Sequence, residues 1–338
     1  MTVSLAPIDF TGQVDYAAAA GRIAALETRF LATADLERLL AAPDEADMYR
    51  ILELAGYRVP ADISGGFEAV VQAFGTDLLA LAESLFPDRD RWIAAYFRAD
   101  VDFLNLKEKA KHERAATAAA PGFEPGGTFD PRLLAAGTLA EVLVDLPADC
   151  RRACEDYLAV RATGLLDHYR LIDAFFDGRK AGLLLRLAER TGSATFMEYT
   201  RARIDAVNIA TVFRMSRRKE AEPGAFLLDG GFVEAGRLAA APAGGETDGA
   251  AVFAGTPYAA VAARIGEALR AGAGLQVVER ETAAIAARAL DRVWYSPHGP
   301  AVVLAHFVKR TAELFNIKRV LFARRRGLDF NAVREHLI

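Results

Sequence analysis

Three helical segments of this sequence carry the same polar pattern inside an otherwise apolar run. Each has an acid three residues before an asparagine and an aliphatic residue directly after it, in DFLNLKEKA, DAVNIATVF and ELFNIKRVL. Asparagine is a poor residue for a helix interior, because its amide competes for nearby backbone groups. Its recurrence at Asn105, Asn208 and Asn316, spaced by 103 and 108 residues, indicates three copies of one helical unit.

Other positions recur around each asparagine. Counting the asparagine as position zero, an aromatic residue lies at −9, a base at −7 and an acid at −3. On a helix with 3.6 residues per turn, the base, the acid and the asparagine form one stripe. The aromatic and the flanking apolar residues fall on the opposite side, where we expect the core. The residues of the polar stripe are Arg98, Asp102, Asn105, Arg201, Asp205, Asn208, Lys309, Glu313 and Asn316.

The sequence leaves three interpretations of this stripe open. The first is a solvated surface with an i,i+4 ion pair, which would contribute about 0.2–0.5 kcal/mol. The second is packing, in which the asparagine and the acid bind the backbone of a neighbouring helix or unit. The third is contact with a partner. We expect packing, because solvent exposure alone would not require asparagine three times, although common ancestry would also preserve it.

Two further markers repeat in the same order. The first is RLLAA or RLAAA, which begins at Arg38, Arg132 and Arg237. The second is a glycine marker after each asparagine helix, at Gly126, Gly230 and Gly327. Glycine commonly ends a helix because it accepts a left-handed backbone, so we expect helix stops there. The markers predict three tandem helical units, 1–127, 128–230 and 231–338, which either stack in a line or close into a ring.

Composition favours an all-α fold. Strong helix formers dominate, and no long alternating segment or hairpin signal stands out. Hydrophobic residues make up 52% of the 338 residues, which is ample material for a core. The net charge of −4 argues against a general nucleic-acid binder, which would be basic.

Basic residues crowd the C-terminal ends of the three asparagine helices. Positive charge there suits the helix dipole. A surplus of it would also form a surface for an acidic partner or for lipid headgroups. The candidate contact residues are Lys109, Lys111, Arg214, Arg217, Arg218, Arg324, Arg325 and Arg326.

Motifs for catalysis, metals and cofactors are missing from the sequence. It contains no P-loop, no dinucleotide fingerprint, no His-Glu-x-x-His and no Asp-Asp-x-x-Asp. Cys150 and Cys154 have no nearby histidine or cysteine that would complete a metal site, so we expect two reduced, partly buried residues. The five histidines are scattered, and His298 in YSPHGP is explained by its turn. We therefore expect no catalytic residue, no metal and no cofactor.

The sequence also predicts a cytosolic chain. Its N-terminus lacks the basic start and apolar core of a signal peptide. The most apolar run near the C-terminus, AVVLAHFV, is far shorter than the roughly 20 residues that a membrane helix needs. Any work at a membrane would then require a partner that is embedded there.

The repeated helices resemble a known family. YFRADVDFLNLKEKAK, YTRARIDAVNIATVFR with the following FLLDGGFVEAGRL, and HFVKRTAELFNIKRVLFARRRGL are similar to the C subunit of V/A-type ATP synthases, which is equivalent to the d subunit of eukaryotic vacuolar ATPases. The N-terminal YAAAAGRIAALETRFL also looks like that family, so the resemblance spans essentially the whole chain. The sequence departs from the pattern at GGETDGA and at the long loop KHERAATAAAPGFEPGG.

This resemblance implies a funnel of three helical units around a pseudo-threefold axis. It implies a non-catalytic socket in the central stalk of a rotary motor, on the cytoplasmic side of the membrane. The cavity would receive the central shaft, which the D and F subunits form, and the wide end would rest on the proteolipid rotor ring, so that torque drives proton or sodium transport. Two other classes remain open from the sequence: an unrelated helical scaffold or regulator, and a helical enzyme with a dispersed site.

Overall fold

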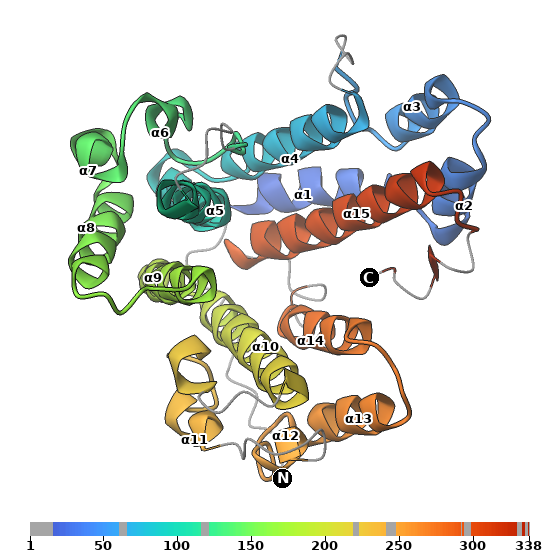
Figure 1. Cartoon of the computed structure of the whole chain (residues 1–338). Coiled ribbons are helices and arrows are strands. Elements are labelled where there is room, and N and C mark those ends of the chain that lie inside the picture. The colour runs from blue at the N-terminus through green and yellow to red at the C-terminus, as the bar shows by residue number, and fades with distance from the viewer. Residues whose placement is uncertain are drawn as a thin grey trace.

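The computed structural model describes residues 16–60, 66–115, 122–218, 223–240, 248–291, 293, 299–329, 333–334 and 337. Every regular element in these ranges is an α-helix or a short 3-10 helix, which confirms the predicted all-α fold (Figure 1). In this described part of the chain, no helix combines the length and the hydropathy that a membrane span requires.

The helices form three consecutive series, each of which ends in a long helix that contains one asparagine. The first series is α1 (Ala17–Glu27), α2 (Thr33–Ala41), α3 (Glu45–Leu54), α4 (Gly66–Ser84) and α5 (Ala94–Ala115). The second is α6 (Arg132–Ala136), α7 (Leu139–Val142), α8 (Ala148–Ala162), α9 (Tyr169–Arg190) and α10 (Ala194–Arg218). The third is α11 (Ala235–Ala239), α12 (Asp248–Ala251), α13 (Ala259–Arg270), α14 (Gln276–Arg288) and α15 (Ala301–Arg325). We call α5, α10 and α15 the asparagine helices.

Each asparagine helix packs mainly against helices of the following series. α5 lies against α9, α10 lies against α14, and α15 lies against α4, α2 and α1 of the first series. The chain therefore closes on itself, with its last long helix beside its first helices (Figure 1). One hydrophobic cluster joins Leu39, Leu52 and Phe74 to Ile317 and Leu321 of α15. The boundaries 1–127, 128–230 and 231–338 stay a prediction, because this packing links each asparagine helix to the next unit.

The three asparagine helices meet at their N-terminal ends, which we call the apex. The Tyr96 hydroxyl of α5 lies 2.7 Å from Thr200 Oγ1 of α10. The Phe97 ring of α5 lies 4.3 Å, centroid to centroid, from the Phe307 ring of α15. From this apex α10 and α15 run apart in Figure 1. The aromatic residues at position −9 thus contribute to the contact between the helices, on the apolar side where the sequence placed them.

The glycine markers serve two different purposes. Gly327 follows the end of α15 with a φ of 64°, as a helix stop does. Gly126 and Gly230 lie well beyond the ends of α5 and α10, in the segments that lead to α6 and α11. Their φ values of 98° and 95° allow turns within these linking segments. The prediction of a helix stop was therefore wrong for Gly126 and Gly230.

Candidate interaction site

The polar stripe of α5 binds the linking segment that follows it. The Asn105 side chain donates to the Glu124 carbonyl and accepts from the Glu124 N–H, both at 2.8 Å. Asp102 accepts from the N–H and the hydroxyl of Thr128, both at 2.7 Å. Arg98 donates to the Gly126 carbonyl at 2.7 Å. We call this set of bonds a clamp, because it holds the linking segment against the helix.

The polar stripe of α10 forms a second clamp of the same design. Asn208 donates to the Leu228 carbonyl at 2.8 Å and accepts from the Leu228 N–H at 2.7 Å. Asp205 accepts from the Phe232 N–H at 2.8 Å. Arg201 donates to the Gly231 carbonyl at 3.0 Å. The same three positions therefore hold the same kind of segment in both series, which explains why asparagine recurs.

Glycine is required in these segments because the acid approaches their backbone closely. A Cβ atom built at Gly127 would collide with Asp102 Oδ1, and one at Gly231 would collide with Asp205 Oδ1. The pair of glycines thus serves both the turn and the acid contact.

The polar stripe of α15 binds residues of the first series, whereas the stripes of α5 and α10 bind the linking segments that follow them. Glu313 accepts from the Leu31 N–H at 2.5 Å and from the Tyr57 hydroxyl. Lys309 pairs with Glu27 at 3.5 Å. Asn316 is buried on the same stripe. The third clamp therefore closes the chain, because its partners lie more than 250 residues earlier in the sequence.

The acids of the clamps are buried. Burial raises the pKa of Asp102 to about 6, although the bonds from Thr128 and the charge of Arg98 act in the opposite direction. Burial likewise raises the pKa of Asp205, against the bonds from Phe232, Tyr258 and Val233. Raised pKa values also occur at catalytic sites. Here the carboxylate oxygens already bind the protein's own backbone, which favours a structural role.

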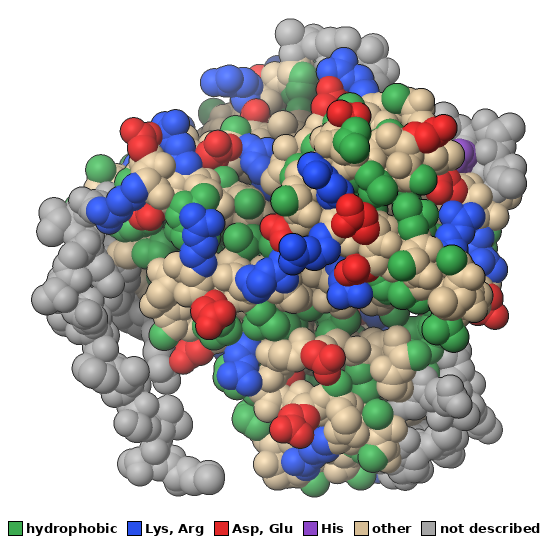
Figure 2. Space-filling view, turned by 90° about the vertical axis from the view of Figure 1, so that its left-hand side faces the viewer, with side chains coloured by type: hydrophobic (Ala, Val, Ile, Leu, Met, Phe, Trp, Pro, Cys, Tyr) green, Lys and Arg blue, Asp and Glu red, His purple; other side chains and the backbone are tan. Residues whose placement is uncertain are grey.

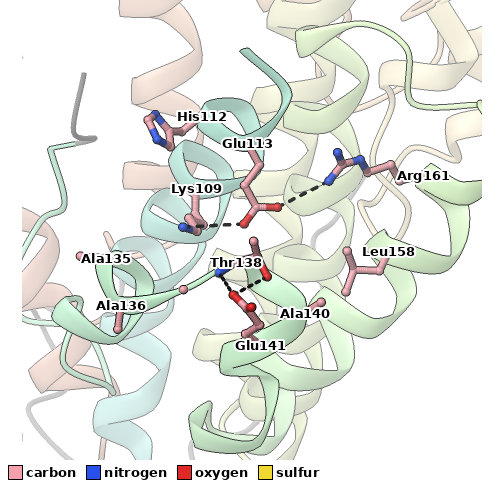
Figure 3. A pocket seen from close by; sticks show the side chains of 11 residues that line it. Lys109, His112, Glu113, Ala135, Ala136, Thr138, Ala140, Glu141, Leu158 and Arg161 are labelled. Carbon is pink, nitrogen blue, oxygen red and sulfur yellow. Dashed lines mark hydrogen bonds and ion pairs between the residues drawn. The ribbon is translucent and has the colours of Figure 1, made fainter. Parts of the chain in front are cut away.

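A pocket of about 590 Å³ between α5, α6, α7 and α8 holds two carboxylates and is a candidate for a dispersed catalytic site (Figure 3). Its Glu113 accepts from the Leu139 N–H at 2.6 Å and lies 3.7 Å from the Lys109 ammonium. Its Glu141 accepts from the N–H and hydroxyl of Thr138 at 2.8 and 2.9 Å, which caps α7. Both carboxylates thus have structural partners. In the described residues, no group of three or more metal-ligating side chains forms a metal site.

Several predicted basic contact residues bind within the chain. Lys109 is buried and pairs with Glu113, and Lys111 pairs with Asp173 of α9 at 2.7 Å. Arg324 donates to the Leu40 carbonyl of α2 at 3.1 Å. Lys111 thus fastens α5 to the second series, and Arg324 fastens α15 to the first. Figure 2 shows the same intermixing of basic and acidic side chains on the face at the left of Figure 1.

The remaining basic residues are exposed. Arg214 lies 3.3 Å from Glu279, and Arg325 pairs with Glu68. Arg217 and Arg326 are also exposed. The side chain of Arg218 lies outside the described residues. Among the described residues, the predicted clusters lie at the ends of three helices, and the acids that pair with Arg214 and Arg325 line one groove.

An exposed apolar position was missed by the sequence. Leu104, Val207 and Phe315 directly precede the three asparagines, and their exposed fractions are 41, 41 and 51%. The expectation that this position faces the core was therefore wrong. One turn earlier on the same face, Asp100 of α5 accepts two bonds from Arg203 of α10, at 2.6 and 2.7 Å. This face of α5 thus lies toward α10.

The fold and these contacts define an all-α protein whose polar clusters serve its own packing and whose asparagine helices expose equivalent apolar side chains. A comparison with protein families identifies it more closely. The family model described as ATP synthase (C/AC39) subunit matches residues 19–336, so the chain belongs to this family, a non-catalytic subunit of the rotary V/A-type ATPase. The resemblance seen in the sequence is thereby confirmed. A comparison with curated protein sequences found no match.

Proposed function

We propose that this chain is the central-stalk socket of a rotary V/A-type ATPase or ATP synthase. It couples the central shaft, formed by the D and F subunits, to the proteolipid rotor ring, and it transmits the torque that accompanies proton or sodium transport. It lies peripherally on the cytoplasmic face of the membrane and hydrolyses nothing itself. Membership of the C/AC39 family carries this proposal.

The packing of the helices suits a part that transmits torque. Such a part must not shear when one partner turns against the other, so its segments need many connections that are distant in sequence. Each asparagine helix packs into the next series, and the third clamp ties the C-terminal helix to the N-terminal helices. A torque applied to one helix is therefore transmitted to all three series.

The apex suggests how the socket is oriented. From the apex, α10 and α15 run apart toward their C-terminal ends (Figure 1). We infer that the socket opens between these C-terminal ends. In our proposal the shaft enters from that open side, and the outer surface around the apex faces the ring. The resemblance alone implied the reverse, with the wide end on the ring. The proposed pseudo-threefold funnel is supported by the cyclic order of the helix contacts.

A pull-down of the tagged chain from gently solubilised native membranes tests this function. We expect mass spectrometry to find the D and F subunits and the proteolipid of the ring, and we expect crosslinking to increase their recovery. Recovery of none of these, from cells that contain an assembled rotary ATPase, would leave an unrelated helical scaffold as the better explanation.

A further inference from the structure

The three asparagine helices differ at two equivalent positions. These positions, −1 and +6, lie about two turns apart on one face of each helix. Their occupants are Leu104 and Lys111 in α5, Val207 and Arg214 in α10, and Phe315 and Phe322 in α15. Only α15 has an aromatic residue at both positions. These two phenylalanines are 51 and 57% exposed.

Phe315 and Phe322 line a groove between α15, α14 and α4. Its volume is about 650 Å³, and Phe67 of α4 contributes to its apolar lining together with Leu328 after α15. Exposed apolar surface of this kind commonly marks a binding site. The equivalent positions in α5 and α10 instead carry the basic side chains of Lys111 and Arg214, which pair with Asp173 and Glu279 of the neighbouring helices.

The charges around the groove favour an acidic occupant. Its two acids, Glu68 and Glu279, are neutralised by Arg325 and Arg214. Arg280 of α14 and Lys318 of α15 also line the groove, and none of the described carboxylates pairs with either of them. An apolar lining with surplus positive charge complements a helix that has apolar residues on one side and acids beside them.

We propose that this groove seats an amphipathic, acidic segment at the tip of the shaft, off the centre of the socket. This inference rests on the proposed function and adds an orientation to it. A seat with three equivalent walls would accept the shaft in three orientations. A seat with one aromatic groove accepts it in one, because the other two walls present paired lysine or arginine side chains where this wall presents Phe322.

Binding of the purified D–F shaft to the isolated chain, followed by calorimetry, tests the seat. We expect Phe315→Ala/Phe322→Ala to weaken binding at least thirtyfold, since buried aromatic anchors dominate interfaces. We expect Leu104→Ala/Val207→Ala, which truncates the equivalent exposed positions, to stay within threefold of the unchanged chain. Melting temperatures of both variants should match that of the unchanged chain, because all four side chains are solvent-exposed.

The possible results distinguish a failure of the proposed groove from a failure of the proposed socket function. No binding by the unchanged chain would overturn the socket itself. Binding that is unaffected by Phe315→Ala/Phe322→Ala, or weakened equally by both double variants, would leave the socket and overturn the off-centre seat. Light scattering provides one further check. If the unchanged chain dimerises and Phe315→Ala/Phe322→Ala makes it monomeric, the groove joins two copies and the proposal fails.

A charge variant tests the acidic character of the occupant. Arg280→Glu/Lys318→Glu should weaken binding of the shaft at least tenfold at low salt and less at high salt, because ions screen exposed charges. If the variant binds the shaft as tightly as the unchanged chain does at both salt concentrations, the assignment of an acidic occupant is overturned.

Discussion

An asparagine side chain can replace a strand partner, because its amide carries a donor and an acceptor in the arrangement of a peptide group. Asn105 and Asn208 use both groups on a single backbone residue, Glu124 and Leu228 respectively. A linking segment that would otherwise lose its backbone partners is thereby satisfied by a helix. This benefit outweighs the weak helix propensity of asparagine at these positions.

Replacing Asn208 by leucine should destabilise the fold. Asn208 is fully buried, so the variant leaves the N–H and carbonyl of Leu228 without a partner and without water. We expect a loss of about 1–3 kcal/mol in the free energy of unfolding, measured by urea denaturation. Thr211→Leu on the exposed side of α10 is the matched control, expected within about 0.5 kcal/mol. Equal unfolding midpoints for the two variants would contradict the clamp.

His306 should make the fold sensitive to acid. It is buried in α15, and burial, together with the charges of Arg310 and Lys309, lowers its pKa from 6.5 to about 4. Between these values the unfolded chain binds a proton that the folded chain does not, so stability falls as the pH drops from about 6.5 toward 4. Glu27 of α1 lies 3.7 Å from the ring and is the facing carboxylate.

The measurement is the free energy of unfolding between pH 7 and 4.5 for the unchanged chain and for His306→Phe. The raised pKa of Asp102 acts in the opposite direction over part of this range, but it is common to both proteins and cancels in their difference. As the pH falls, we expect the unchanged chain to lose more free energy of unfolding than His306→Phe does. Parallel curves would refute the assignment to His306.

At the scale of elements, the helices cooperate across the ends of the chain. α15 shares a hydrophobic cluster with α2 and α4, whereas α13 shares one with α10 and α14. Helices that share a cluster should therefore open together, even where they are remote in sequence, and helices of different clusters should open separately.

Two substitutions that each create a cavity in one cluster test this grouping, with hydrogen exchange as the measurement. Ile317 of α15 and Ile265 of α13 are both fully buried, and truncating either to alanine should cost about 2–5 kcal/mol. Ile317→Ala should raise amide exchange in α2 and α4, and Ile265→Ala should raise it in α10 and α14. The same exchange pattern in both variants would show that the molecule opens as one unit instead.

The sequence was informative about helices and poor about what joins them. Apolar periodicity and the three asparagines predicted the all-α fold, because both signals lie within single helices. The partners of Asn105 and Asn208 could not be predicted, since Glu124 and Leu228 lie in irregular segments without a periodic signal. Hydropathy also cannot distinguish a core residue from an exposed contact residue, so Phe315 was wrongly expected to face the core.

At the scale of the whole molecule, an ion pair joins two of the helices that meet at the apex. Asp100 of α5 binds Arg203 of α10 and lies 3.1 Å from Lys180 of α9. Burial acts to raise the pKa of Asp100, but the two cations hold it well below its usual range. Three helices from two series are thus fixed at one point.

Reversing the charges of this ion pair tests whether it stabilises the apex. Asp100→Arg places three cations together, and we expect a clearly lower melting temperature. The double variant Asp100→Arg/Arg203→Asp should recover part of the loss, because one pair is restored while Lys180 still faces a cation. Thermal unfolding of the three proteins gives the coupling. Losses that simply add would mean that the pair contributes nothing to the apex.

The closure of the chain by α15 also has a consequence for its synthesis on the ribosome. The apolar faces of α2 and α4 emerge early, but their partner in α15 is translated last. The apolar faces of these N-terminal helices therefore stay exposed during most of translation. Exposed apolar surface on nascent chains is what chaperones bind. A truncated chain would never complete its third clamp, so incomplete products would be recognised by quality control before they could reach the motor.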